Sequence, residues 1–573
     1  MMSLKKTYLL IILALATVFT LIFIFTEYVE GEGFNPSDDG VVLAQSYRII
    51  NGEVPHTDFI SIRPVFSGLL HTIHFYSPLP LQISARWFVI LEFFLYSLIW
   101  VFFIMKLIPF NEIGRKKMYF AILLMICFVF NLSMYNLYPW TTIDAILFSS
   151  AGILLWLNGR QKHGLRWLSI SAGLFLLAIS ALCRQNFVFL FAAFSVLTMI
   201  VFSREKKWGQ MIATLGAGAL PLVIYLIILA YNNGIGDFII QMTGRTELLK
   251  TGVFTFAKRF AESVFLEWYI ALAVLFGLSF IRKTTGEKIK LFLEITPYIN
   301  ISLALIISSV LFFRETDFLF LTSFELFWLF SCTYILHFFL VKGSTEYKNK
   351  GWIILMFGWV SSISLGDNAP AFVMGIMLIS ILVFNMSLVW HKPLIRRKFV
   401  IYVLGIFSMA MAVAEIYGQK SNNYRELPAS QLQYNLGEIY PGFGGIITNQ
   451  NTYNYYKELK EIIDSNPGMK DRFVVIPNNP LIYAVSGSRN PMPLDWMQQA
   501  EYVGSEKRIV EELKMLIQET DTVWFIIDKY DSKKMCDSLF EMDYSTGNHD
   551  YYDLLTKLTK ESEKKYHNFV IRF

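Results

Sequence analysis

The chain has 573 residues, of which 54% are hydrophobic and only 17% charged, and its mean hydropathy is +0.46. Soluble globular proteins carry about 25% charged residues, so the composition of the chain as a whole excludes an ordinary soluble protein. The net charge of +5 says little about function by itself, because the placement of Lys and Arg matters more than their total in membrane proteins. We expect no nucleic-acid partner. The four cysteines form no CxxC pair, which disfavours a disulfide framework or a zinc site.

Apolar stretches long enough to cross a bilayer recur along the first 420 positions. They predict a polytopic α-helical membrane protein with about thirteen transmembrane helices. The predicted spans are 5–27, 86–108, 118–136, 141–158, 167–183, 186–203, 209–232, 259–281, 289–312, 318–340, 351–366, 370–390 and 399–417. The first apolar run is longer than a signal-peptide h-region and no small-residue cleavage site follows it, so it is predicted to be an uncleaved span.

Basic residues gather in alternate connecting loops, such as "GRKK" at 114–117, "GRQKHGLR" at 159–166 and "HKPLIRRK" at 391–398. The other loops are longer or acidic. The positive-inside rule puts the basic loops and the N-terminus in the cytoplasm, and an odd number of spans then puts the C-terminal part outside.

The region from 418 to 573 is polar and differs from the transmembrane region, 1–417. Short apolar runs predict strands, and periodic segments between them predict helices, which together indicate an extracytoplasmic α/β domain. The predicted strands are 472–477, 481–487, 522–528 and 568–573, and the predicted helices are 451–464, 503–519 and 549–560.

The first outer loop, 28–85, is long for a simple connection and rich in acidic residues. Asp38 and Asp39 precede "VVLAQSYRII", which predicts a short amphipathic helix in the interface. Either carboxylate is a candidate general base or a group that orients an acceptor hydroxyl. The alternative is a simple cap at the N-terminus of that helix.

This loop resembles the first outer loop of the GT-C membrane glycosyltransferases, in the branch of protein mannosyltransferase-like and aminoarabinose transferase-like enzymes. The resemblance lies in an acidic residue after the first span, a helix with small residues and tyrosine, and the turn "GEVPHTDF" at 52–59. His56 stands where Tyr is usual, and Arg63-Pro64-Val65 stands where prolines are usual. Later segments with the same likeness are 183–191, 218–241, 359–379 and the tail stretch "FVVIPNNPLIYAVSGSRNPMP".

The resemblance implies transfer of a sugar from a polyprenyl-phosphate donor to a glycan, lipid or protein acceptor, in the bacterial inner membrane. An outward-facing enzyme of this kind needs cations for the lipid phosphate and a carboxylate for the acceptor hydroxyl. The sequence contains no P-loop, GxSxG or HExxH motif and no clustered metal-ligand spacing, and we name no metal ligands. The acid-rich first loop leaves a divalent cation open, because some relatives in the superfamily use one.

Few cations lie on the predicted outer side, and Arg184, Arg314 and Arg245 are the candidates for the donor phosphate. Each could instead snorkel or pair with a neighbouring acid. Asp144, at the start of the fourth span, is a further candidate catalytic carboxylate, with an interfacial charge as the alternative.

His56, Asp58 and Arg63 are candidates for positioning the loop or the acceptor, and Arg63 could bind Asp58 and hold the turn. The acidic residues within spans, Glu92 among them, are functional candidates by their position, but polar bridging between helices explains them at least as well, and we do not name them as catalytic. Other functions left open are a lipid-linked glycan flippase or transporter and a polysaccharide polymerase. No internal repeat favours a transporter.

Overall fold

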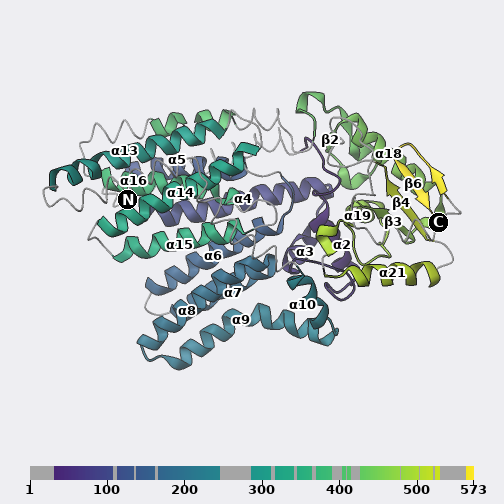
Figure 1. The fold of residues 1–573 in the computed structure, drawn as a ribbon, viewed down its shortest axis with the longest axis horizontal. Coiled ribbons are helices and arrows are strands. Elements are labelled where there is room, and N and C mark those ends of the chain that lie inside the picture. Colours follow the sequence, from purple (N-terminus) through teal and green to yellow (C-terminus); the bar gives the residue numbers. More distant parts are fainter. Residues whose placement is uncertain are drawn as a thin grey trace, which may run out of the picture.

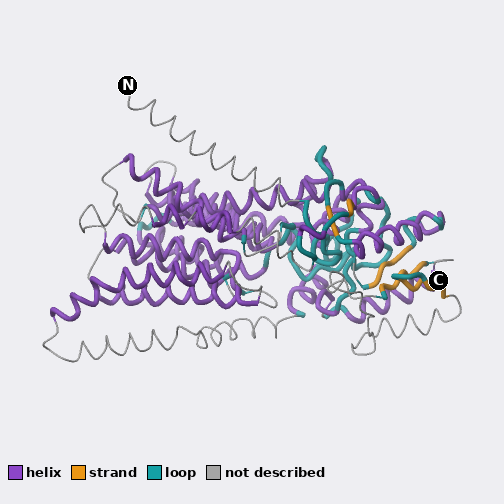
Figure 2. The backbone as a smooth tube through the Cα atoms, turned by 90° about the horizontal axis from the view of Figure 1, so that it is seen from above, coloured by secondary structure: helices purple, strands orange, loops and turns teal. Residues whose placement is uncertain are grey.

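The computed structural model describes residues 31–106, 113–133, 137–161, 166–244, 286–311, 317–340, 345–363, 370–389, 403–407, 409–414, 426–477, 479–502, 504–519, 523–529 and 563–572. A bundle of long helices forms one end of the molecule, and the strands lie at the other end (Figures 1 and 2). The first loop lies between these two parts (Figure 1).

Five of the described helices are long and apolar enough to cross a membrane. They are α4 (Leu81–Met105), α6 (Thr141–Gln161), α7 (Arg166–Cys183), α8 (Val188–Arg204) together with the preceding 3-10 helix η2 (Gln185–Phe187), and α9 (Trp208–Tyr231). The bundle also contains α5 (Ile113–Leu132), α13 (Gly286–Leu311), α14 (Asp317–Leu340), α15 (Thr345–Ser362) and α16 (Met374–Val389). Each of these helices falls on a predicted span.

The total of thirteen spans remains a prediction. The segments 5–27 and 259–281 lie outside the described residues, and 399–417 is described only in part.

Close contact between α6 and α7 brings the start of one helix beside the end of the other. A Cβ atom on Gly152 would lie 2.8 Å from the carbonyl oxygen of Gly173, and one on Gly173 would lie 2.7 Å from that of Gly152. Glycine at both positions therefore permits this close approach of the two backbones, as is common where membrane helices pack through small residues.

The first loop folds into α2 (Val41–Ile50), α3 (Phe66–Leu70) and the 3-10 helix η1 (His71–Tyr76). The helix predicted from "VVLAQSYRII" is therefore confirmed. Phe34 and Leu43 of this loop belong to one apolar cluster with Tyr456 and Phe473 of the C-terminal part. The loop thus forms part of the C-terminal core.

The C-terminal part contains a four-stranded sheet in the order β3-β4-β6-β5. Its strands are β3 (Phe473–Ile476), β4 (Trp524–Asp528), β6 (Phe569–Arg572) and β5 (Glu563–Lys565). The β3–β4 pair is parallel, and the other two pairs are antiparallel.

Two helices cover opposite faces of this sheet. Phe473 and Val475 pack in one cluster with residues of α18 (Gln450–Asp464). Their neighbours Val474 and Ile476 pack in another cluster with residues of α21 (Glu506–Glu519). All four residues of β3 are buried, as expected for a strand covered on both sides.

The strand predicted at 481–487 is wrong, because Ile482–Ser486 forms the short helix α19. Gly487 ends this helix in the left-handed conformation, with φ of 68°. The hydroxyl of Tyr483 accepts a hydrogen bond from the backbone N–H of Val475 at 3.0 Å. The helix thus covers the edge strand β3, where a further strand would otherwise pair.

Candidate active site

Asp39 lies in a buried turn where the first loop meets the start of α4. The side-chain oxygen of Asn35 accepts hydrogen bonds from the N–H groups of Ser37 and Asp38, at 3.0 and 2.9 Å. In return, Asp39 Oδ2 accepts from the N–H of Asn35 at 3.2 Å and from Arg86 Nη2 at 3.1 Å. Arg86 also donates to the carbonyl of Gly33 at 2.6 Å, so a single guanidinium fixes both the turn and the carboxylate.

Burial controls the acidity of this carboxyl group. Asp39 is only 5% exposed, and burial raises its pKa to about 6. The Arg86 cation and the Asn35 N–H oppose this effect, and the nearby charge of Asp38 adds to it. A carboxylate with such a pKa is ionised near neutral pH and is still basic enough to accept a proton.

The alternative reading of Asp38 and Asp39 as helix caps is wrong. The N-cap of α2 is Gly40, and no side chain caps the helix. A Cβ atom at Gly40 would lie 2.6 Å from the Cβ atom of Leu481, so the C-terminal part packs directly on this turn. Asp38 is buried beside Asp39, with 6% exposure.

Asp144 belongs to a second buried polar group at the start of α6. Its Oδ1 lies 3.1 Å from His71 Nε2, and both side chains are fully buried. Arg184, at the end of α7, donates to the hydroxyl of Thr141 at 3.0 Å. The close packing of α6 and α7 therefore brings two predicted site residues, Asp144 and Arg184, to the same end of the bundle.

The other two arginines predicted to bind phosphate, Arg245 and Arg314, lie outside the described residues. Of the three, only Arg184 can be placed, and it is 6% exposed. A buried guanidinium keeps its charge and attracts anions more strongly than an exposed one.

His56 attaches the first loop to α9 and to α10 (Ile235–Thr243). Its ring is fully buried and edge-on to Phe238, and Nδ1 lies 2.7 Å from Gln241 Oε1. Gln241 returns a hydrogen bond to the carbonyl of His56 at 2.9 Å. Burial lowers the pKa of His56 to about 4, so the ring is neutral at physiological pH.

The predicted pairing of Arg63 with Asp58 is wrong. Arg63 forms a bidentate ion pair with Glu501, at 2.6 and 2.9 Å, and stacks over Trp140 at 5.0 Å. Asp58 is exposed and instead accepts from the N–H of Val54 at 2.6 Å, which closes the turn by itself. Arg63 thus joins the first loop to the C-terminal part, because a carboxylate 438 residues away fits its fork.

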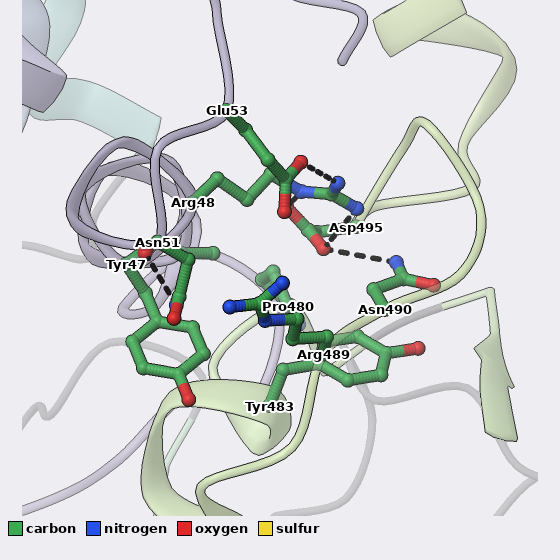
Figure 3. A pocket seen from close by; sticks show the side chains of 10 residues that line it. Tyr47, Arg48, Asn51, Glu53, Pro480, Tyr483, Arg489, Asn490 and Asp495 are labelled. Carbon is green, nitrogen blue, oxygen red and sulfur yellow. Dashed lines mark hydrogen bonds and ion pairs between the residues drawn. The ribbon is translucent and has the colours of Figure 1, made fainter. Parts of the chain in front are cut away.

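A small pocket lies between α2 and the C-terminal part, and Arg48 forms part of its lining (Figure 3). Arg48 Nε and Nη2 donate to the two carboxylate oxygens of Asp495, at 2.7 and 2.9 Å. Its Nη1 donates to Glu53 at 2.6 Å. Figure 3 shows Tyr47 and Asn51 on one side of the pocket and Asn490 on the other. Arg48, like Arg63, connects the loop to the C-terminal part by a buried ion pair.

Several residues of these contacts were not singled out by the sequence. They are Arg48, His71, Arg86, Asp495 and Glu501. None stands in a recognisable motif, and each is joined to its partner by tertiary packing. The sequence offers one signal for such buried ion pairs, which is that the first loop, 28–85, carries many charged side chains together with large apolar residues.

No model of a protein family matches the chain, and no curated protein does. Among solved structures, ArnT from Cupriavidus metallidurans is similar in its apo state, with TM-score 0.40, 10% identity, and coverage of 98% of this chain and 97% of that one. The same protein bound to undecaprenyl phosphate matches with TM-score 0.37, 11% identity, and the same coverage of 98% and 97%.

The archaeal oligosaccharyltransferase AglB from Archaeoglobus fulgidus, in complex with an inhibitory peptide and a dolichol-phosphate, has TM-score 0.44 and 10% identity. That match covers 90% of this chain and 69% of the other. Both proteins are GT-C glycosyltransferases, the superfamily that the sequence motifs resemble.

Proposed function

We propose that this chain is an integral membrane glycosyltransferase that transfers a sugar from a polyprenyl-phosphate donor to an acceptor on the extracytoplasmic side. The observation that carries the proposal is the buried Asp39 carboxylate, held by Arg86 and with a pKa of about 6. A base of this strength suits proton transfer from an acceptor hydroxyl near neutral pH. The resemblance of residues 38–59 to the GT-C first outer loop supports the same role.

In the proposed reaction, the acceptor oxygen attacks the anomeric carbon of the donor sugar. The new bond joins these two atoms, and the bond from the anomeric carbon to the phosphate oxygen breaks. The acceptor proton moves to Asp39, and the polyprenyl phosphate leaves with the electron pair. Arg86 holds the Asp39 carboxylate in place and stabilises its charged form before the transfer.

Arg184 is the proposed cation for the lipid phosphate. It is buried at the end of α7, and Thr141 of α6 holds its guanidinium. Arg314 and Arg245 remain candidates for the same anion. Asp144 and Asp38 are proposed as further acidic groups of the site, and a carboxylate near the sugar would also stabilise an oxocarbenium-like transition state.

The proposed topology follows the charge pattern of the loops. The N-terminus would be cytoplasmic, and residues 418–573 would form an extracytoplasmic α/β domain in the bacterial inner membrane. The ion pairs of Arg48 and Arg63 would then hold this domain over the first outer loop. A reporter fused at residue 420 tests this arrangement, because a cytoplasmic signal there contradicts it.

The choice of donor can be tested with the purified full-length chain in lipid vesicles. Radiolabelled sugars are supplied either on a polyprenyl phosphate or as the corresponding nucleotide sugar, together with membranes that carry acceptors. We expect label to enter the acceptor fraction only from the lipid-linked donor. Transfer from the nucleotide sugar alone, or from neither donor over a panel of sugars, would overturn the proposal.

A further inference from the structure

Three buried side chains with metal-binding atoms converge beside α6. They are His71 of η1, Glu92 of α4 and Asp144 of α6, and their ligand atoms all lie within 4.8 Å of one another. His71 Nε2 and Asp144 Oδ1 are 3.1 Å apart. Ligand atoms bound to one ion at about 2.1 Å lie at most about 4.2 Å apart, so the spacing of these three side chains is close to that of a coordination sphere.

The two carboxylates of this cluster have oxygen atoms that accept no hydrogen bond from the described residues. Glu92 is 1% exposed, and neither of its carboxylate oxygens has a hydrogen-bond partner among the described residues. Asp144 is fully buried, and its Oδ2 also has none. Two adjacent buried carboxylates are costly unless they share a proton or bind a cation.

The imidazole of His71 is arranged as the ligand of a metal would be. Its Nδ1 faces Nε2 of His74 at 2.9 Å, and Nδ1 of His74 faces the hydroxyl of Ser84 at 2.9 Å. Metal-bound histidines commonly engage their second nitrogen in such a hydrogen bond, which fixes the tautomer and the ring orientation. This chain of contacts leaves Nε2 of His71 directed at the carboxylates.

We propose that His71, Glu92 and Asp144 bind one divalent transition-metal ion, Mn²⁺ or Zn²⁺. One imidazole nitrogen with carboxylate oxygens suits these ions better than Ca²⁺ or Mg²⁺, which prefer oxygen ligands alone. The site contains neither Asp38 nor Asp39. It would fix the first turn of α6, from which Thr141 holds Arg184. The proposal depends on these contacts and not on the proposed glycosyl transfer.

The test uses the full-length chain, purified in detergent and stripped with a chelator. Mn²⁺, Zn²⁺ and Mg²⁺ are each added back, and bound metal is measured by mass spectrometry while thermal unfolding is followed. We expect about one Mn²⁺ or Zn²⁺ per chain, an unfolding temperature that rises with the concentration of that ion, and no comparable effect of Mg²⁺. Glu92→Gln and Asp144→Asn are expected to weaken binding at least tenfold. The matched control is Glu325→Gln, which alters a buried acid of α14 outside the cluster and should bind as the wild type does.

If the two carboxylates share a proton instead, the stripped wild type will bind neither ion, and this result overturns the proposal. Metal binding that survives Glu92→Gln and Asp144→Asn unchanged also overturns it. If those variants fail to fold, the electron spin-echo spectrum of Mn²⁺ bound to the wild-type protein tests whether a histidine is a ligand. Nitrogen coupling from one histidine supports the site, and its absence contradicts it.

Discussion

Arg48→Met should weaken the attachment of the C-terminal part to the first loop. Arg48 is 4% exposed and makes four hydrogen bonds, to both oxygens of Asp495, to Glu53 and to the carbonyl of Met492. Methionine retains most of the apolar stem and removes the charge. The variant therefore leaves two carboxylates without their cation.

Removing one member of a buried ion pair typically costs about 3–5 kcal/mol. Side-chain exposure is 11% for Asp495 and 24% for Glu53, so water relieves part of this cost. Asp495 also keeps its hydrogen bond from Asn490, at 2.9 Å. We therefore expect the lower end, about 3 kcal/mol, which lowers the unfolding temperature of a unit of about 150 residues by roughly 6–12 °C.

The assay is thermal unfolding in detergent, followed by tryptophan fluorescence and by limited proteolysis of residues 426–572. Asp495→Asn should be destabilising as well, and the double variant should cost less than the sum of the two single variants. Lys460→Gln, which removes an exposed pair with Asp464, is the control and should change little. An Arg48→Met protein that unfolds and resists protease as the wild type does would refute this account of the interface.

Three further results are expected. The transfer rate should rise with pH through about 6, as Asp39 loses its proton. Arg86→Gln should move this rise to higher pH, because it removes the cation that favours the carboxylate. If the rise stays at the same pH in Arg86→Gln, Asp39 is excluded as the titrating group. The stability of the fold should fall as pH drops from 6.5 towards 4, because His56 in the unfolded chain binds a proton at a higher pH than the buried ring does. Asparagine tolerates the φ of 68° at this position, so His56→Asn should fold and lose this contribution to the pH dependence. If the pH dependence of stability is unchanged in His56→Asn, another group causes it. Arg184→Gln should raise the KM for the lipid donor at least tenfold in a transfer assay and leave the unfolding temperature within a few degrees, and an unaltered KM would remove Arg184 from the phosphate site.

Local patterns in the sequence predicted much of the fold. Helix α2, helix α18 and strand β3 lie where apolar periodicity put them, and their ends agree with the prediction to within one residue. The error at 481–487 has a local cause, because a short apolar run fits a strand or a buried helix equally well. Its structure was decided by tertiary packing, through the contact of Tyr483 with β3.

The candidate site was less predictable because its partners are distant in sequence. Asp39 and Asp144 were identified by residue type and by position beside predicted helices. Arg86 and Glu501, which bind Asp39 and Arg63, are respectively 47 and 438 residues from their partners. No rule of sequence spacing predicts such pairs, because a guanidinium group meets its carboxylate only after the helices and strands have packed together.

The central claim is that Asp39 accepts the proton of the acceptor. The most direct test compares Asp39→Asn with its neighbour Asp38→Asn, measuring single-turnover sugar transfer and binding of the polyprenyl-phosphate donor in the same preparations. We predict that Asp39→Asn binds the donor normally and transfers at least 100-fold more slowly, while Asp38→Asn loses less, because general-base catalysis contributes about 10²–10⁴-fold. Full transfer by Asp39→Asn with intact donor binding would contradict the claim.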